Sequence, residues 1–252
     1  MKLLVTGGLG FIGSNFIIQS LSNHPDHEII NIDKIGIGAN PENLKKLENR
    51  NRYRFIKGDI SNPKLVQEAI KDVDVVVNFA AETHVDRSIS NPNPFIESNY
   101  IGTFNLLEAE RKMDRKIRHI QISTDEVYGD ITKGSFTETD NLRPSNPYAA
   151  TKAAADLLCN AYARTYGMNI VVTRCTNNYG PYQFPEKLIP KTILRAINNL
   201  KIPVYGTGEA IRDWLYVLGH CAAIENMMNK GKRGEVYNVS AGNEVKVIDI
   251  VF

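Results

Sequence analysis

The stretch MKLLVTGGLGFIGS, residues 1–14, decides the fold of this chain. Its first six residues form an apolar run typical of a buried parallel strand, and the run leads directly into a glycine turn and the start of a helix. Gly7, Gly10 and Gly13 permit a tight turn, close approach of the backbone to a pyrophosphate, and close packing of helix on strand. Because the first N–H groups of that helix are free to receive an anion, the stretch predicts a phosphate-binding turn.

A second strand candidate, residues 28–32, is followed by Asp33, about 20 residues after the glycines, as a dinucleotide-binding fingerprint requires. An acid at the carboxyl end of this strand suits the 2′-hydroxyl of NAD and repels the extra phosphate of NADP. We therefore predict NAD as the cofactor. The weaker interpretation is that Asp33 is an ordinary loop acid.

The rest of the chain alternates between strand and helix patterns, which predicts an α/β fold with a doubly wound parallel (Rossmann) sheet. Long helical patterns cover residues 11–22, 94–113 and 148–166, and residues 130–147 read as a loop. Strand candidates end near Thr6, Ile32, Lys57, Phe79, Ser123 and Arg174. After residue 175 the alternation weakens. We predict an NAD-binding Rossmann domain over residues 1–175 and a smaller, partial substrate-binding lobe over residues 176–252.

Two pairs of polar residues point to chemistry at the ends of these elements. Tyr148 and Lys152 lie four apart and share a helix face, so the ammonium is expected to lower the pKa of the phenol. Asp125 and Glu126 follow an apolar run, and two close carboxyls can supply an acid and a base at one pH because like charges raise one pKa. The alternatives are a chance pair on a long helix and acids that cap a strand end.

Composition excludes several classes of protein. The chain has 252 residues, 42% of them hydrophobic, with 30 basic against 28 acidic side chains and a net charge of +2. Without a basic run or stripe, no nucleic-acid partner is expected. No apolar stretch approaches the roughly 20 residues that span a bilayer, and the first residues form a strand where a signal peptide would have a basic region. We therefore expect no membrane partner and a cytoplasmic location.

Cysteine and histidine spacing favours neither a metal site nor a hydrolase. Cys159, Cys175 and Cys221 are far apart and read as small buried hydrophobes, and no histidine pair has metal-ligand spacing. The segment from His84 to Ser88 contains a His, an Asp and a Ser, but the chain has no Gly-x-Ser-x-Gly elbow. We therefore predict no metal and no catalytic triad.

Six segments, in order along the chain, resemble the extended short-chain dehydrogenase/reductases, and among them the dTDP-glucose 4,6-dehydratase family. They are GGLGFIGS at 7–14, AAETHVDRS at 80–88, STDEVYG at 123–129, YAATK at 148–152, NNYGPYQFPEKL at 177–188 and RDWLYV at 212–217. This resemblance implies a lyase that converts dTDP-glucose to dTDP-4-keto-6-deoxyglucose and water by internal hydride transfer through bound NAD.

The resemblance also implies roles for five residues. Tyr148 would be the base at the C4 hydroxyl, Lys152 would bind the nicotinamide ribose, and Thr124 would hydrogen-bond O4. Glu126 would remove the C5 proton, and Asp125 would protonate the departing C6 hydroxyl. A 4-epimerase of the same fold would use the Tyr and Lys without needing the two acids.

Cofactor contacts implied by the resemblance and the glycine turn are Gly7, Gly10, Phe11, Ile12, Gly13, Asp33, Asp59, Ile60, Ala80, Ala81, Tyr148, Lys152 and Asn178. Asp59 is where the adenine amino group would be bound. Implied substrate contacts are Thr83, Thr124, Asn177, Lys187, Leu188, Pro203, Tyr205 and Arg212. A guanidinium at Arg212 suits a diphosphate, and the alternative is an exposed pair with Glu209 or Asp213.

Two departures from the family pattern affect the substrate lobe. Relatives continue well beyond Phe252, so we expect the chain to be truncated, and Leu218-Gly219 and Val247 stand where relatives commonly show acidic residues and an Asn. Recognition of the thymidine base is therefore an open question. A non-catalytic NAD-binding module is the third hypothesis. The helices over 94–113 and 148–166 correspond to those that pair two subunits in this family, so a homodimer is expected.

Overall fold

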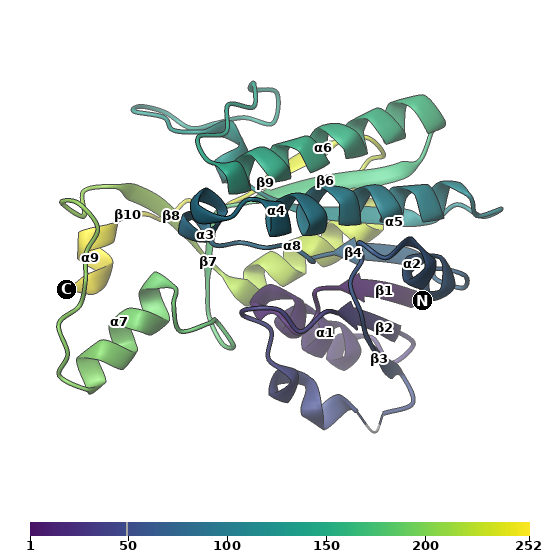
Figure 1. The fold of residues 1–252 in the computed structure, drawn as a ribbon, viewed down its shortest axis with the longest axis horizontal. Helices are drawn as coiled ribbons and strands as arrows, with labels where there is room; N and C mark the ends of the chain where they lie inside the picture. Colours follow the sequence, from purple (N-terminus) through teal and green to yellow (C-terminus); the bar gives the residue numbers. More distant parts are fainter. Residues whose placement is uncertain (49) are drawn as a thin grey trace.

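The computed structural model describes residues 1–48 and 50–252. Its centre is a seven-stranded parallel sheet with the strand order β3-β2-β1-β4-β5-β6-β9 (Figure 1). The strands are β1 Lys2–Thr6, β2 Glu28–Asp33, β3 Tyr53–Lys57, β4 Val75–Asn78, β5 Arg118–Thr124, β6 Asn169–Cys175 and β9 Val236–Val239. The predicted doubly wound Rossmann sheet is thereby confirmed.

Helices cover both faces of the sheet, because successive strand residues point in opposite directions. Leu3 and Val5 of β1 pack in one core cluster with Phe16 of α1, whereas Leu4 packs in a second cluster with Leu106 of α5. Helices α1 and α8 lie on the first face, and α2, α5 and α6 on the other (Figure 1). The bounds are α1 Phe11–Asn23, α2 Pro63–Ala69, α5 Gly102–Arg111, α6 Pro147–Tyr166 and α8 Val217–Lys230.

Helix α6, which carries Tyr148 and Lys152, begins and ends where its sequence dictates. The side chain of Asn146 accepts a hydrogen bond from the N–H of Ala149 at 2.9 Å, and Pro147 occupies the first helical position. At the other end Gly167 adopts the left-handed conformation with φ of 67°. The predicted helix is confirmed to within one residue.

The prediction of one regular helix over residues 94–113 is wrong in detail. The structure has α3 Val85–Ser90, α4 Asn93–Phe95, a π-helical segment Ile96–Ile101, and then α5. In the π segment, Asn99 accepts a hydrogen bond from the N–H of Glu82 at 2.8 Å and donates to the hydroxyl of Thr151 at 2.9 Å. These bonds tie the widened turn to α6 and to the loop after β4, and helical periodicity in the sequence does not reveal them.

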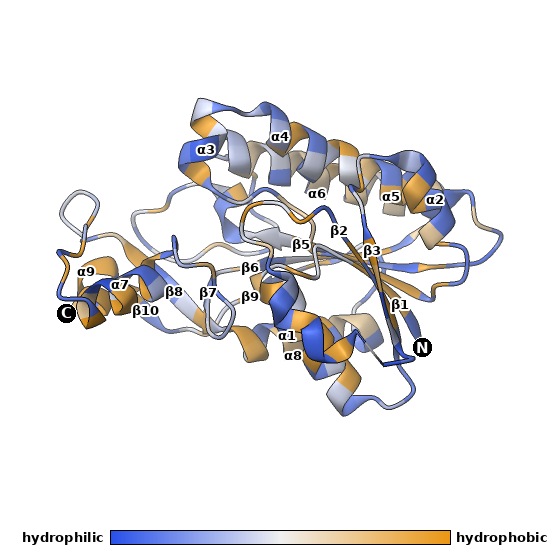
Figure 2. Cartoon of the chain, turned by 60° about the horizontal axis from the view of Figure 1, so that its bottom comes forward, coloured by the Kyte–Doolittle hydropathy of each residue, from blue (hydrophilic) through white to orange (hydrophobic). Residues whose placement is uncertain are grey.

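The later part of the chain builds a small lobe and also returns to the main sheet. Strands β7 Asn177–Tyr179, β8 Ile211–Tyr216 and β10 Glu244–Lys246 form a second sheet, flanked by α7 Leu188–Ile197 and α9 Val247–Val251. Figure 2 shows apolar colouring on α7 and α9, at the end of the molecule that carries the C-terminus. Strand β9 pairs with β6, and α8 packs on α1. The main sheet and its helices therefore include residues from beyond the predicted domain boundary at residue 175.

Candidate active site

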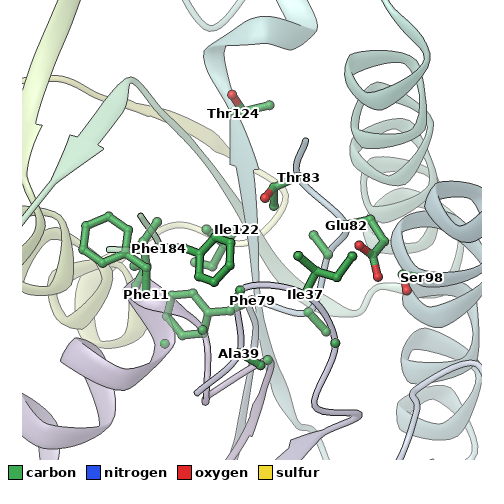
Figure 3. Close-up of a pocket in the computed structure, with 18 of the residues that line it drawn as sticks. Phe11, Ile37, Ala39, Phe79, Glu82, Thr83, Ser98, Ile122, Thr124 and Phe184 are labelled. Carbon is green, nitrogen blue, oxygen red and sulfur yellow. The ribbon is translucent and has the colours of Figure 1, made fainter. Parts of the chain in front are cut away.

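A pocket lies at the carboxyl ends of the parallel strands, where ligands of open α/β sheets bind. In Figure 3 the apolar side chains Phe11, Phe79, Ile122 and Phe184 gather in its centre. Thr124 stands above them at the end of β5. The pocket therefore brings together the glycine turn, the end of β5 and the lobe.

The glycine turn has no room for side chains. Gly7 has φ of +68°, and a Cβ on it would lie 2.6 Å from the backbone nitrogen of Ala80. A Cβ on Gly13 would lie 2.5 Å from the carbonyl oxygen of Gly7. Helix α1 starts after Gly10, which has no side chain to cap the first N–H groups. This bare helix start fits the pyrophosphate of a dinucleotide, as the sequence predicts.

Asp33 ends β2 with its carboxylate held by the backbone. Its Oδ2 accepts from the N–H of Leu9 at 3.0 Å, and its Oδ1 accepts from the N–H of Ile35 at 2.8 Å. Burial is the main cause that raises the pKa of Asp33, and the two backbone bonds oppose it. The carboxylate is therefore oriented at the strand end with lone pairs left over for a ligand hydroxyl.

Sequence reasoning missed three residues of the pocket lining, Lys34, Glu82 and Ser98. The ammonium of Lys34 lies 2.8 Å from the carboxylate of Glu82 and donates to the hydroxyl of Ser98 at 2.6 Å. All three line the pocket, and Figure 3 shows Glu82 and Ser98 side by side at its edge. The place of Lys34, directly after the strand-end acid, was the available signal. Ser98 lies on the π segment and gave none.

Tyr148 and Lys152 both line the pocket, but the expected effect of Lys152 on the Tyr148 pKa is wrong for this structure. Burial raises the pKa of the Tyr148 phenol well above its usual value, and the carboxylate of Glu126 adds to this effect. Lys152 Nζ donates to the carbonyl of Ile122 at 2.6 Å. Burial also lowers the pKa of Lys152. Because the Tyr148 pKa is raised, the phenol stays protonated in this structure.

The two adjacent carboxyls lie in a 3-10 helix, Asp125–Tyr128, that follows β5. Thr124 caps this turn by accepting from the N–H of Glu126 at 3.3 Å, and its hydroxyl donates to Asp125 Oδ1 at 3.1 Å. Burial raises the pKa of Asp125 to about 6, and Glu126 adds to the shift. Glu126 is exposed and accepts from the amide of Asn146 at 3.4 Å. The two carboxyls therefore sit in different environments, since Asp125 is half-buried and Glu126 is exposed.

The structure places every predicted cofactor residue in the pocket lining. Of the predicted substrate residues, the lining includes Thr83, Thr124, Asn177 and Lys187. It does not include Leu188, Pro203, Tyr205 and Arg212, which belong to the lobe. Tyr205 is 82% exposed. Among the described ion pairs, Glu209 pairs with Lys246, and Asp213 accepts from the hydroxyl of Thr176, so neither forms the predicted alternative pair with Arg212.

A second charged group, not predicted from the sequence, lies at the lobe side of the pocket. Glu186 accepts from the guanidinium of Arg87 and lies 3.8 Å from the imidazole of His84. Next to it, Lys187 donates to the carbonyl of Thr83 at 3.4 Å, and burial lowers the Lys187 pKa. The hydroxyl of Ser88 donates to the carbonyl of Val85, away from any triad. Of the basic side chains in this group, Lys187 is the one that lines the pocket, whereas Arg87 is paired with Glu186.

The three cysteines are buried and free, as predicted. Ligand atoms of His24, Asp26 and His27 lie within 4.8 Å of one another, which histidine spacing alone did not indicate. The two rings stack with centroids 4.3 Å apart and planes 24° apart, so their in-plane lone pairs do not converge on one ion. His27 Nδ1 also lies 2.9 Å from the hydroxyl of Ser20.

Within residues 1–48 and 50–252, no helix has the length and apolar character needed to cross a membrane.

Comparison with known proteins identifies relatives across the whole chain. The family model described as GDP-mannose 4,6 dehydratase matches residues 4–252. A dTDP-glucose 4,6-dehydratase of Escherichia coli is 47% identical over 100% of this chain and 75% of its own length. A low-salt glycan biosynthesis protein of Haloferax volcanii is 48% identical over 99% of this chain and 80% of its own length.

Solved structures agree with these matches. The crystal structure of dTDP-glucose 4,6-dehydratase from Bacillus anthracis in complex with NAD has a TM-score of 0.94 and 46% identity, covering 100% of this chain and 78% of its own. A UDP-glucuronic acid 4-epimerase of Bacillus cereus is more distant, with 30% identity and a TM-score of 0.91, covering 99% and 80%. The fold is therefore shared by both classes of enzyme, and sequence identity favours the dehydratases.

Proposed function

This chain belongs to the family described by the GDP-mannose 4,6 dehydratase model, and on that premise we propose that it is an NAD-dependent dTDP-glucose 4,6-dehydratase, a lyase. The observation that carries the proposal is the 3-10 turn after β5. It presents Asp125 and Glu126 in the pocket that also holds Tyr148 and Lys152. A 4-epimerase needs the second pair without the first.

The glycine turn, Asp33 and the lining of the sheet side fit NAD, and we assign the pyrophosphate to the turn and the adenosine ribose to Asp33. When bound, NAD would supply the hydride acceptor for C4 and the hydride donor for C6, and its oxidised nicotinamide carries a positive charge. Lys152 would hold the nicotinamide ribose. The remaining predicted cofactor contacts are Phe11, Ile12, Asp59, Ile60, Ala80, Ala81 and Asn178.

In the first step we assign the base to Tyr148, which would take the proton of the C4 hydroxyl while Thr124 hydrogen-bonds the same oxygen. Burial keeps the phenol protonated in this structure. Positive charge near the phenol would favour its deprotonated form, so Tyr148 would act as the base in the enzyme that holds the cofactor.

In the elimination, Glu126 would remove the C5 proton and Asp125 would protonate the C6 hydroxyl as it leaves. Their environments support this division. Burial raises the pKa of Asp125 to about 6, which favours its protonated form as the acid. Glu126 is exposed and lines the pocket, where its side chain can approach the substrate as the proposed base. One turn of the chain thus supplies the proposed acid and the proposed base.

The diphosphate of the substrate would meet the lobe. Lys187 lines the pocket there. Arg212 does not line the pocket, but its charge lowers the pKa of Asp125, which supports a place for the guanidinium toward that end of the site. Thr83, Asn177, Leu188, Pro203 and Tyr205 complete the proposed substrate contacts. Residues 176–252 would thus act chiefly in binding the nucleotide sugar, and residues 1–175 in binding NAD.

A pair of substitutions tests the assignment. Glu126→Gln keeps size and polarity but removes the base, so reduction of the cofactor should proceed while elimination slows by about 10² to 10⁴. Tyr148→Phe should stop the reaction before any reduction. The measurements are absorbance of reduced nicotinamide after mixing with dTDP-glucose and absorbance of the keto sugar in alkali. Normal turnover of Glu126→Gln to a C4 epimer would identify an epimerase instead, and absence of any turnover by the wild type would support the non-catalytic module.

We also propose a cytoplasmic homodimer. Phe104 on α5 and Leu157 on α6 are 39% and 59% exposed, and these adjacent helices form one outer layer of the molecule (Figure 1). Exposed apolar side chains on neighbouring helices support packing against a second copy as a four-helix layer.

A further inference from the structure

A buried ion pair lies behind the proposed catalytic residues. Asp156 of α6 is fully buried, and its Oδ2 accepts from Arg174 Nε of β6 at 3.0 Å. Arg174 is 3% exposed. Replacing such a pair by apolar residues is often neutral or stabilising, so stability alone does not explain it. The contacts of Asp156 and Arg174 with other side chains offer a functional reason for the pair.

At one end the pair faces Lys152. Asp156 lies one helical turn after Lys152 on the same face of α6. Its other oxygen, Oδ1, is buried without a hydrogen-bond partner among the described residues, and so is the hydroxyl of Ser123 on β5. Lys152 itself donates to the carbonyl of Ile122, next to that serine. No ion pair within 4.0 Å joins Asp156 to Lys152 among the described residues, but both side chains are buried on one face of α6, and the charge of Asp156 raises the Lys152 pKa against the effect of burial.

At the other end the pair reaches the turn that carries the two acids. Arg174 Nη1 donates to the hydroxyl of Tyr128 at 2.7 Å, and this hydroxyl donates to the side chain of Asn238 on β9, also at 2.7 Å. Tyr128 is the last residue of the 3-10 turn Asp125–Tyr128. Its ring stacks on Phe136 at 4.9 Å. The turn is thereby fixed to β6 and β9 through one hydroxyl.

We propose that Asp156, Arg174 and Tyr128 form a positioning unit for the proposed reaction, in which Asp156 holds the Lys152 ammonium charged and Tyr128 fixes the turn that bears Asp125 and Glu126. This inference rests on the proposed function. None of the three residues lines the pocket, so they would act through the residues that do. The unit links the oxidation half of the site to the elimination half.

Asp156→Asn tests the first contact. Without the carboxylate, Lys152 should lose its proton at lower pH, so the alkaline limb of the pH profile of kcat should move down by about one unit or more. The ionisable groups that face Lys152 are Asp156 and Cys159 on α6 and Cys175 on β6, with Arg174 behind Asp156 and Tyr148, Asp125 and Glu126 on the pocket side. Asp140→Asn, at an exposed loop carboxyl, should leave the profile in place. A lower kcat with an unmoved limb would overturn the role.

Tyr128→Phe tests the second contact and leaves the Asp156–Arg174 pair intact, so it decides the proposal even if Asp156→Asn fails to fold. We expect kcat to fall about 10-fold or more, with KM for dTDP-glucose little changed and reduced nicotinamide accumulating, because the displaced turn slows elimination. Tyr162→Phe is the matched control, since it removes a hydroxyl of α6 that donates to Glu108 of α5, and neither residue lines the pocket. It should turn over as the wild type does.

Normal kcat and no accumulation in Tyr128→Phe would refute the inference. The wild type assayed alongside separates this result from failure of the proposed function, because an inactive wild type would refute the dehydratase itself.

Discussion

Replacing Asp125 by Asn should stabilise the protein at neutral pH while it disables the elimination. Burial raises the pKa of this carboxyl from 3.8 to about 6, and the neighbouring Glu126 contributes in the same direction. The folded state therefore binds the proton more tightly than the unfolded state does, and stability falls as pH rises from about 4 to about 6. Asn keeps the neutral shape and avoids this loss.

The size of the gain follows from the shift. One pKa unit corresponds to about 1.4 kcal/mol, so the free energy of unfolding of Asp125→Asn should exceed that of the wild type by about 3 kcal/mol at pH 8. At pH 4.5, which is less than one unit above the unfolded-state pKa and where the folded-state carboxyl is still mostly protonated, the gain should be about 1 kcal/mol. The gain should thus grow with pH and level off above pH 7.

The assay is urea denaturation at both pH values with NAD at one fixed concentration, because a ligand that binds the folded state shifts apparent stability. Asp140→Asn provides a control of opposite sign. Bonds from the N–H and hydroxyl of Thr137 lower the Asp140 pKa, so its replacement should not stabilise. The free energy of unfolding of Asp125→Asn minus that of the wild type should be larger at pH 8 than at pH 4.5. If this difference were the same at both pH values, the argument from burial would be wrong.

The remaining predictions concern cofactor and assembly. The cofactor released by denaturing the purified protein should be NAD, since Asp33 would repel a 2′-phosphate, and chromatographic recovery of NADP alone would contradict that reading. Gly7→Ala should abolish tight NAD binding in a calorimetric titration because its Cβ would meet Ala80 at 2.6 Å, whereas Gly134→Ala, at a similar positive φ in open space, should bind normally. Light scattering should give the mass of two chains at micromolar concentration, and the mass of one chain throughout would exclude the dimer.

The parts of this molecule that depend on local pattern could be predicted from the sequence, and those that depend on distant contacts could not. The glycine turn and the capped start of α6 are set by residues a few positions apart, and Asp33 is marked by the short apolar strand that it ends. The π segment and the Lys34–Glu82–Ser98 contact join elements that are far apart in the chain, and single-residue periodicity carries no trace of them. The Tyr148 pKa shows the same limit. The helical spacing of Lys152 was correct, but burial outweighs it, and burial is a property of the folded molecule.

The return of the chain to the main sheet affects the order in which the sheet can form during synthesis and the ways in which its parts can be exchanged. The polypeptide leaves the Rossmann sheet after β6, comes back for α8 and β9, and leaves again for β10. The sheet therefore gains its last strand only after residue 239 has been synthesised, and a fragment cut at residue 175 would leave the edge of β6 unpaired. The two parts are threaded together by three crossings of the chain, so neither could be exchanged for a homologous module at a single junction.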